Sequence, residues 1–144
     1  MPKAFLVLNP ISGSLNPEIR RQKFEQHFTR LGWSHEVYLT TGSEDLPAII
    51  RQAVKNGANL VIASGGDGTI SAAATGMLGA NVPLGILPSG TGNMFARDIA
   101  IPFDPDRALE LITGEHDLLE TDLMVACGRA MVLNLSVGLS AQTV

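Results

Sequence analysis

The sequence predicts an α/β domain in which a parallel sheet carries helices on both faces, followed by the opening β-hairpin of a second, β-rich domain. Over residues 1–115, strand-like runs alternate with helix-like segments. The runs Ala4–Leu8 and Leu60–Ala63 are wholly apolar, as expected of strands buried on both faces. Beyond residue 115 the helical period stops. We therefore assign residues 1–115 to the α/β domain and residues 116–144 to the opening hairpin of an incomplete second domain.

Length and composition fit one globular domain with the start of another. The chain has 144 residues, of which 45% are hydrophobic and 17% charged, and a net charge of -4. The net charge is negative and nothing indicates the extended basic surface of a nucleic-acid-binding protein, so we expect no nucleic-acid partner. The single cysteine, Cys127, cannot form an intrachain disulfide, which fits a reducing compartment. The sequence shows no long apolar run and no signal-peptide pattern, so we expect a cytoplasmic protein that can visit a membrane surface peripherally.

The first half of the chain divides clearly by period and by capping residues. Asn16 is expected to cap a helix that has Pro17 in its first position and ends at Gly32. The expected buried face of this helix consists of Ile19, Phe24, Phe28 and Leu31. Trp33–Leu39 is predicted as the second strand. The next helix ends at Gly57 and is expected to bury Leu46, Ile49, Ile50, Ala53 and Val54.

The second half continues the alternation and then changes to strands alone. A small-residue helix over residues 70–78 follows the central strand, and Pro83–Leu87 is the next strand. A short helix carries Phe95, Ala96 and Arg97, and another runs from Asp104 and Pro105 to Gly114. Two antiparallel strands, 118–126 and 130–137, are predicted around a turn at Cys127.

Three glycine-bearing loops follow three of the predicted strands. They are Asn9–Ser14, Gly65–Thr69 and Pro88–Asn93. The carboxyl ends of parallel strands meet at one edge of a sheet, where ligands of such folds bind. Glycine lets the backbone approach an oxyanion, and a following helix adds the positive end of its dipole. The loops therefore predict a polyphosphate site, although neither a GK[ST] P-loop nor a GxGxxG pattern is present.

Asp67 is the one charged residue inside the central loop. It can hold a metal ion through water or accept a proton from an attacking hydroxyl. The alternative is a turn aspartate that caps the next helix through its carboxylate. The two partner loops favour the functional interpretation. The sequence does not assign the metal ligands.

Other polar residues carry weaker signals. His27, His35 and His116 show no metal-binding spacing and are expected to have surface or packing roles. Arg20, Arg21 and Lys23 form a small basic patch on the first predicted helix, which is either a solvated face or a contact for lipid headgroups. Arg97 either meets a phosphate or forms a surface salt bridge.

The three loop sequences resemble those of the diacylglycerol kinase catalytic domain family, which includes bacterial lipid kinases, sphingosine kinases and ceramide kinases. The resemblance rests on NPISG at residues 9–13, GGDGT at residues 65–69 and LPSGTGN at residues 87–93. Order and spacing agree along the whole chain. In the tail, Asp122 and the run at residues 133–138 resemble the entry into the family's second domain.

This resemblance implies an NAD kinase/diacylglycerol kinase-like fold. It also implies a lipid kinase that moves the γ-phosphoryl group of ATP to a lipid hydroxyl, such as that of diacylglycerol, with Mg²⁺ and at a membrane surface. By motif, Asp67 would be the catalytic acid. The positions that would bind the nucleotide are Asn9, Pro10, Ile11, Ser12, Gly13, Thr40, Gly65, Gly66, Gly68, Thr69, Gly90, Thr91 and Asn93.

The chain departs from the family pattern at two places and in length. Ser71 and Ala72 replace an Asn-Glu pair, and Met94 replaces an acid, so two carboxylates near the expected magnesium are absent. The family's second domain supplies a general base and much of the lipid pocket. We therefore expect an incomplete, weakly active or inactive fragment, whose hairpin edges offer a route to a homodimer.

Two alternatives remain open at this level. An NAD kinase-like enzyme also carries GGDGT, but the NPxSG loop argues against it. A non-enzymatic nucleotide-binding module is favoured by the missing second domain and by Ala72 and Met94. The sequence identifies neither the lipid nor the phosphoryl donor.

Overall fold

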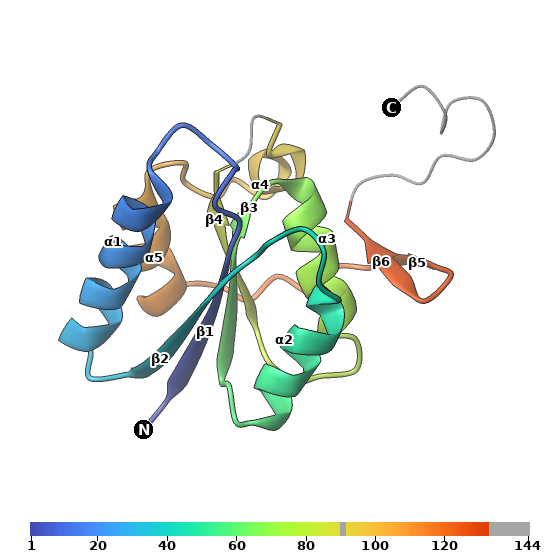
Figure 1. The fold of residues 1–144 in the computed structure, drawn as a ribbon, viewed down its shortest axis with the longest axis horizontal. Helices are drawn as coiled ribbons and strands as arrows, with labels where there is room; N and C mark the ends of the chain where they lie inside the picture. Colours follow the sequence, from blue (N-terminus) through green and yellow to red (C-terminus); the bar gives the residue numbers. More distant parts are fainter. Residues whose placement is uncertain (90–91, 133–144) are drawn as a thin grey trace.

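The fold, obtained as a computed structural model, describes residues 1–89 and 92–132. Four parallel strands form a sheet with the order β2-β1-β3-β4 (Figure 1). The strands are β1 (Lys3–Leu8), β2 (Ser34–Leu39), β3 (Leu60–Gly65) and β4 (Leu84–Pro88). The helices are α1 (Pro17–Arg30), α2 (Leu46–Lys55), α3 (Asp67–Gly76), α4 (Met94–Asp98) and α5 (Pro105–Thr113). The predicted α/β class is confirmed.

Helices cover both faces of the sheet, and the strand residues alternate between them. In β1, Phe5 and Val7 pack into the core beneath α2 and α3, whereas Leu6 and Leu8 pack into the core beneath α1 and α5. Every residue of β3 is buried. This two-sided burial explains why β1 and β3 have near-continuous apolar sequences.

The strand order reverses direction between β1 and β3. The chain leaves β1 for α1 on one face and then forms β2 on one side of β1. It leaves β3 for α3 on the opposite face and then forms β4 on the other side. The helices that follow β1 and β3 therefore lie on opposite faces of the sheet. In folds of this kind, ligands bind outside the carboxyl ends of the strands at such a reversal of strand order.

Two expectations for the helices are wrong. Helix α3 begins at Asp67 rather than at Ile70, because Gly66 is its N-cap residue. In α1, Ile19 is 44% exposed and Leu31 is 42% exposed. Ile19 lies off the buried stripe, and Leu31 is the C-cap beyond the last helical residue. The buried residues of α1 are Arg20, Phe24, His27 and Phe28.

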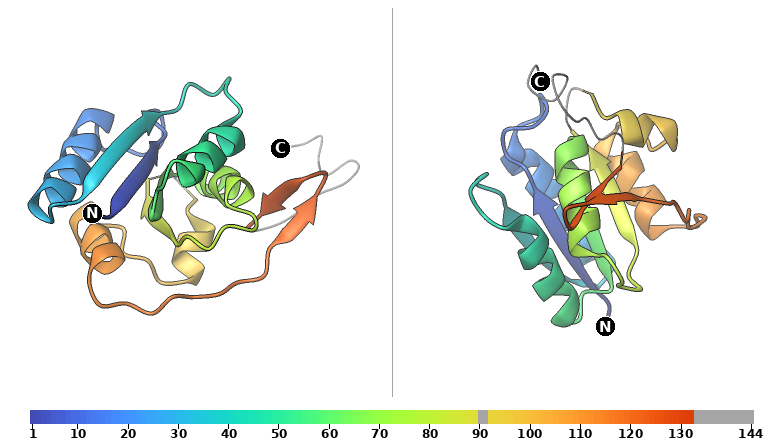
Figure 2. Two further views of the ribbon diagram at one scale, coloured as in Figure 1. Left: turned by 90° about the horizontal axis from the view of Figure 1, so that it is seen from below. Right: turned by 90° about the vertical axis from the view of Figure 1, so that its right-hand side faces the viewer.

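After α5 the chain forms the predicted antiparallel hairpin, β5 (Met124–Ala126) and β6 (Arg129–Met131). Figure 2 shows the connecting segment running along the side of the molecule to a hairpin beside α3. The predicted strand over 118–126 is wrong for residues 118–123, which form no strand and include two largely exposed leucines, Leu118 and Leu119. Residues 133–137 of the second predicted strand lie outside the described residues, and the assignment of 116–144 to a second domain stays a prediction.

The outer edge of β6 is satisfied by α3. Ala130 N donates to Thr75 Oγ1 at 2.8 Å, and Val132 N donates to Ser71 Oγ at 3.4 Å. Among the described residues, the three-residue strand β5 pairs only with β6, so its other edge has no strand partner there. Across the described ranges, no helix is both long and apolar enough to cross a membrane.

Candidate functional site

The central glycine loop opens one side of the α3 N-terminus to solvent. At Gly65 a Cβ would lie 2.4 Å from Thr69 Oγ1 and 2.6 Å from Thr69 Cβ, so only glycine fits against the first turn of α3. At Gly68 a Cβ would meet nothing within 4 Å. The first backbone N–H groups of a helix have no acceptor within the helix. The first turn of α3 therefore offers backbone donors beside open space at Gly68.

The Asp67 carboxylate connects this loop to α4. Its Oδ2 accepts a hydrogen bond from Met94 N and its Oδ1 accepts one from Phe95 N, both at 3.1 Å. Asp67 thus caps the first turn of α4. The alternative interpretation, that the Asp67 carboxylate caps a helix, is correct. The capped helix is α4, however, and not α3, because Asp67 is itself the first residue of α3. Each carboxylate oxygen keeps a second lone pair, so a role in transfer stays a prediction.

The loop after β1 is shaped by its own side chains. Asn9 Oδ1 accepts a hydrogen bond from Ile11 N at 3.1 Å, and Ser12 Oγ donates to Asn9 O at 3.0 Å. Together these bonds fold residues 9–12 into a compact turn. Ile11 is 91% exposed, so its side chain points away from the protein core.

This loop touches the loop after β4. Ser12 Oγ and Ser89 Oγ form a hydrogen bond of 2.8 Å. Gly13 has a φ of +78°, and a Cβ there would lie 2.1 Å from Ser89 O. Glycine is therefore required at position 13 both by the backbone angle and by the close approach of the two loops. The motifs at residues 9–13 and 87–89 lie together at the carboxyl edge of the sheet, as the sequence predicts.

Arg20, which lies on α1, connects these two loops through hydrogen bonds, and the sequence interpretation missed it. It does not belong to a basic surface patch with Arg21 and Lys23, because it is only 6% exposed. Its guanidinium donates to Asn9 O and Ser89 Oγ, each at 2.9 Å. The available signal was its helical spacing with the buried Phe24, four residues further along α1.

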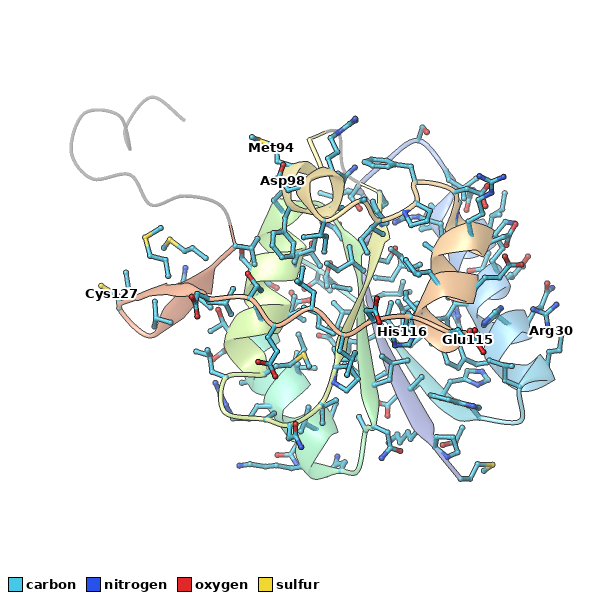
Figure 3. The ribbon with its side chains drawn as sticks, turned by 180° about the vertical axis from the view of Figure 1, so that it is seen from behind. Arg30, Met94, Asp98, Glu115, His116 and Cys127 are labelled. Carbon is cyan, nitrogen blue, oxygen red and sulfur yellow. The ribbon has the colours of Figure 1, made fainter. Side chains whose placement is uncertain are left out.

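The remaining predicted positions are distributed around the same edge. Thr40 follows β2, and its N donates to Leu8 O at 3.0 Å. Asn93 is buried with a φ of +48°, immediately before α4. Gly90 and Thr91 lie outside the described residues. Figure 3 shows Met94 and Asp98 on α4 at this edge, and Cys127 far from it at the hairpin turn.

Arg97 and His27 have protein partners. Arg97 Nε donates to Gly92 O at 3.2 Å, and its guanidinium carbon lies 4.6 Å from the centre of the Phe103 ring. His27 Nε2 lies 2.8 Å from Thr113 Oγ1. Burial, followed by the charge of Arg30, lowers the pKa of His27. The packing role expected for His27 is thus confirmed, and Arg97 braces the loop before α4.

A hollow of about 810 Å³ lies between the start of α2, α3 and the hairpin. Gly68 and Ala72 line its α3 side, and its lining contains two basic residues, Arg51 and Arg129, and two acidic residues, Glu44 and Asp45. Backbone amides, first its own and then that of Thr41, lower the pKa of Glu44 to about 2, so it is an anion at neutral pH. The hollow offers space for a ligand next to the open side of the α3 N-terminus.

Within the described residues, no three His, Cys, Asp or Glu side chains come together as a metal cage. Asp67 is the carboxylate of the central loop, and the positions of the two absent acids hold Ala72 and Met94. Mg²⁺ commonly keeps several waters and binds through one or two carboxylates together with substrate phosphates. The residues present fit a Mg²⁺ ion that arrives with phosphates, with Asp67 as a nearby acceptor.

A parallel sheet with glycine loops at its carboxyl edge is an architecture common among domains that bind phosphate-bearing ligands. The sequence model of the diacylglycerol kinase catalytic domain matches residues 3–126. The chain therefore belongs to the diacylglycerol kinase catalytic domain family.

Individual relatives agree with this family. A probable lipid kinase YegS-like protein of Pseudomonas fluorescens is 33% identical over 138 residues, which cover 94% of this chain and 44% of that protein. The probable lipid kinase YegS of Escherichia coli is 32% identical over 142 residues, covering 95% and 46% of the two chains. A crystal structure of a diacylglycerol kinase from Bacillus anthracis superimposes with a TM-score of 0.67 at 25% identity, covering 77% of this chain and 39% of that one. This chain spans less than half the length of the curated relatives it matches.

Proposed function

We propose that this chain is the nucleotide-binding part of a lipid kinase that transfers the γ-phosphoryl group of ATP to a lipid hydroxyl, such as that of diacylglycerol. The observation that carries the proposal is that three loops lie together at one edge of the sheet, beside the open first turn of α3 at Gly68. Family membership favours a lipid acceptor over the NAD kinase-like alternative. The non-enzymatic module remains the second candidate, supported by Ala72 and Met94.

Each loop has a distinct task in this proposal. The amides of Gly66–Thr69 and the dipole of α3 receive the phosphates, and Asn9–Gly13 and Thr40 border the rest of the nucleotide. Asp67 holds α4 through its two backbone hydrogen bonds, and its remaining lone pairs could accept a proton from the acceptor hydroxyl or help to hold Mg²⁺ through water. Bound Mg²⁺ would offset charge on the β- and γ-phosphates. Positioning and charge compensation of this kind provide most of the catalysis of phosphoryl transfer.

The reaction forms a bond between the lipid oxygen and the γ-phosphorus and breaks the bond to the β,γ-bridging oxygen. ADP leaves, and the hydroxyl proton passes to a base. Because the acceptor is a lipid, the working enzyme must approach a membrane surface from the cytoplasm. Homodimerisation remains a proposal for the edge of β5, where Met124 and Val125 are exposed.

The test is a transfer assay with the full-length protein that carries this chain, using ATP labelled in its γ-phosphate. Vesicles with and without diacylglycerol, a panel of other lipids, and NAD serve as acceptors. A labelled phospholipid, lost in Asp67→Asn, is the expected product. Labelled NAD phosphate would contradict the lipid kinase proposal. ATP binding without transfer to any acceptor would favour the non-enzymatic module.

A further inference from the structure

Arg20 is a buried cation that touches the ends of three strands. Its Nη2 donates to Asn9 O, just after β1, at 2.9 Å. Its Nη1 donates to Ser89 Oγ, just after β4, at 2.9 Å, and to Ser64 Oγ, near the end of β3, at 3.3 Å. One guanidinium on α1 therefore holds the parts of the site contributed by three separate strands.

These partners leave the positive charge of Arg20 uncompensated. All three acceptors are neutral oxygens, and among the described residues Arg20 takes part in no ion pair. Its Nε is also buried and has no hydrogen-bond partner among the described residues. Burial lowers the pKa of Arg20, yet a guanidinium remains protonated at neutral pH. A buried charge without a counterion is costly to a protein and is compensated when an anion binds nearby.

We propose that Arg20 is a positioning residue for the polyphosphate: it holds the three loops in one arrangement, and its uncompensated charge favours the phosphates of the bound nucleotide. This inference rests on the proposed nucleotide site. Both Nη groups are engaged by the protein, so Arg20 acts through Asn9, Ser64 and Ser89 and through its field. Its effect should therefore grow with the number of phosphates on the ligand.

The experiment compares Arg20→Met, Arg20→Lys and the matched control Arg21→Met. Met keeps the length and apolar stem without the charge, and Lys keeps the charge without the planar fork. Arg21 is the next residue on α1 and is paired at the surface with Glu25 at 2.9 Å. Dissociation constants for ATP, ADP and AMP are measured by calorimetry. Amide hydrogen exchange of the unliganded proteins reports the loop at residues 9–13 and the segment at 86–89, which comprises the end of β4 and the start of its loop.

We expect Arg20→Met to weaken ATP binding about 10- to 100-fold, as expected for one lost charge at an effective dielectric constant near 20. The loss should be smaller for ADP and smallest for AMP. Arg20→Lys should recover part of the ATP affinity, and Arg21→Met should match the wild type. Without ligand, exchange should accelerate in both loops of Arg20→Met while α2 is unaffected.

Equal losses for the three nucleotides, with Lys no better than Met, would overturn the role of the charge. If Arg20→Met does not fold, the comparison of Arg20→Lys with the wild type across the same three ligands decides the matter. If the wild type binds neither ATP nor inorganic tripolyphosphate, the proposed function itself fails. Even if the protein binds no nucleotide, the exchange measurement tests whether Arg20 holds the loops. Unchanged loop exchange in Arg20→Met would overturn this role, whereas faster exchange would support the loop-holding role without the role of the charge.

Discussion

The contact of Gly13 with Ser89 allows a quantitative test of how the loops are joined. Gly13→Ala places a Cβ 2.1 Å from Ser89 O, whereas ordinary contacts begin at 3.4 Å. The two loops must therefore separate by about 1.3 Å, the difference between these two distances. A matched control exists at Gly57, which has a φ of +89° and nothing within 4 Å of a new Cβ.

The expected energies follow from these two environments. Gly57→Ala should cost about 1–2 kcal/mol, the strain of an alanine in the left-handed region. Gly13→Ala has the same strain and also breaks the 2.8 Å hydrogen bond between Ser12 and Ser89, which adds about 0.5–1.5 kcal/mol. Together these two contributions are about 1.5–3.5 kcal/mol for Gly13→Ala, with further steric strain wherever the loops resist separation.

Urea unfolding of both variants and the wild type measures these values by linear extrapolation. Calorimetry with ATP then shows whether separating the loops weakens binding, which we expect for Gly13→Ala and not for Gly57→Ala. A Gly13→Ala protein no less stable than Gly57→Ala would refute the close approach of the two loops. Unchanged ATP affinity in Gly13→Ala would refute their joint role in the site.

Three further predictions concern other parts of the molecule. Gly68→Ala should keep or raise the stability of the protein, because Ala in a helix is favoured over Gly by about 1 kcal/mol, yet it should weaken ATP binding by filling the open space. Gly65→Ala should instead lower the stability, because its Cβ would clash with Thr69. Urea unfolding measures the stability of both variants, and calorimetry measures their ATP affinity. Asp67→Ala should lower the stability of the protein by about 1–2 kcal/mol because it uncaps α4, and Asp67→Asn should lower it less, since one acceptor oxygen remains. Both variants should lose phosphoryl transfer. Wild-type turnover by Asp67→Asn would show that Asp67 is a helix cap alone. The pKa of His27 is lower in the native protein than in the unfolded chain, so the unfolded chain binds more protons at pH values between the two pKa values. The free energy of unfolding should therefore fall as the pH drops through about 6.5, and it should level off below the native pKa. His27→Gln should reduce this slope in urea titrations at pH 7.5 and 5.5, and equal slopes would contradict the assignment.

The sequence was sufficient for β1, β3 and the starts of α1 and α5, because strands buried on both faces have continuous apolar runs and helices begin at capping residues. The wholly apolar run at Ala4–Leu8 and the caps Asn16 and Asp104 each predicted an element that the structure contains. The three glycine loops also predicted a common edge, because parallel strands place their carboxyl ends together.

Tertiary contacts determined what the sequence could not predict. The carboxylate of Asp67 caps a helix that begins 27 residues later, and no local pattern encodes that pairing. Arg20 was assigned to the surface because arginine is mostly exposed, yet its three acceptors lie at the ends of three different strands, two of them 44 and 69 residues away along the chain. Leu118 and Leu119 looked like part of a strand by composition, but both are largely exposed and their segment forms no strand.

The central claim is that phosphates bind at the edge formed by the loops after β1, β3 and β4. Backbone amide NMR of the protein during titration with ATP, and separately with adenosine, tests it most directly. We predict that ATP shifts the amides of residues 9–13 and 66–70 strongly, whereas adenosine leaves residues 66–70 nearly unchanged, because those amides face the phosphates. Equal shifts with both ligands at residues 66–70, or ATP-induced shifts confined to other elements, would contradict the account.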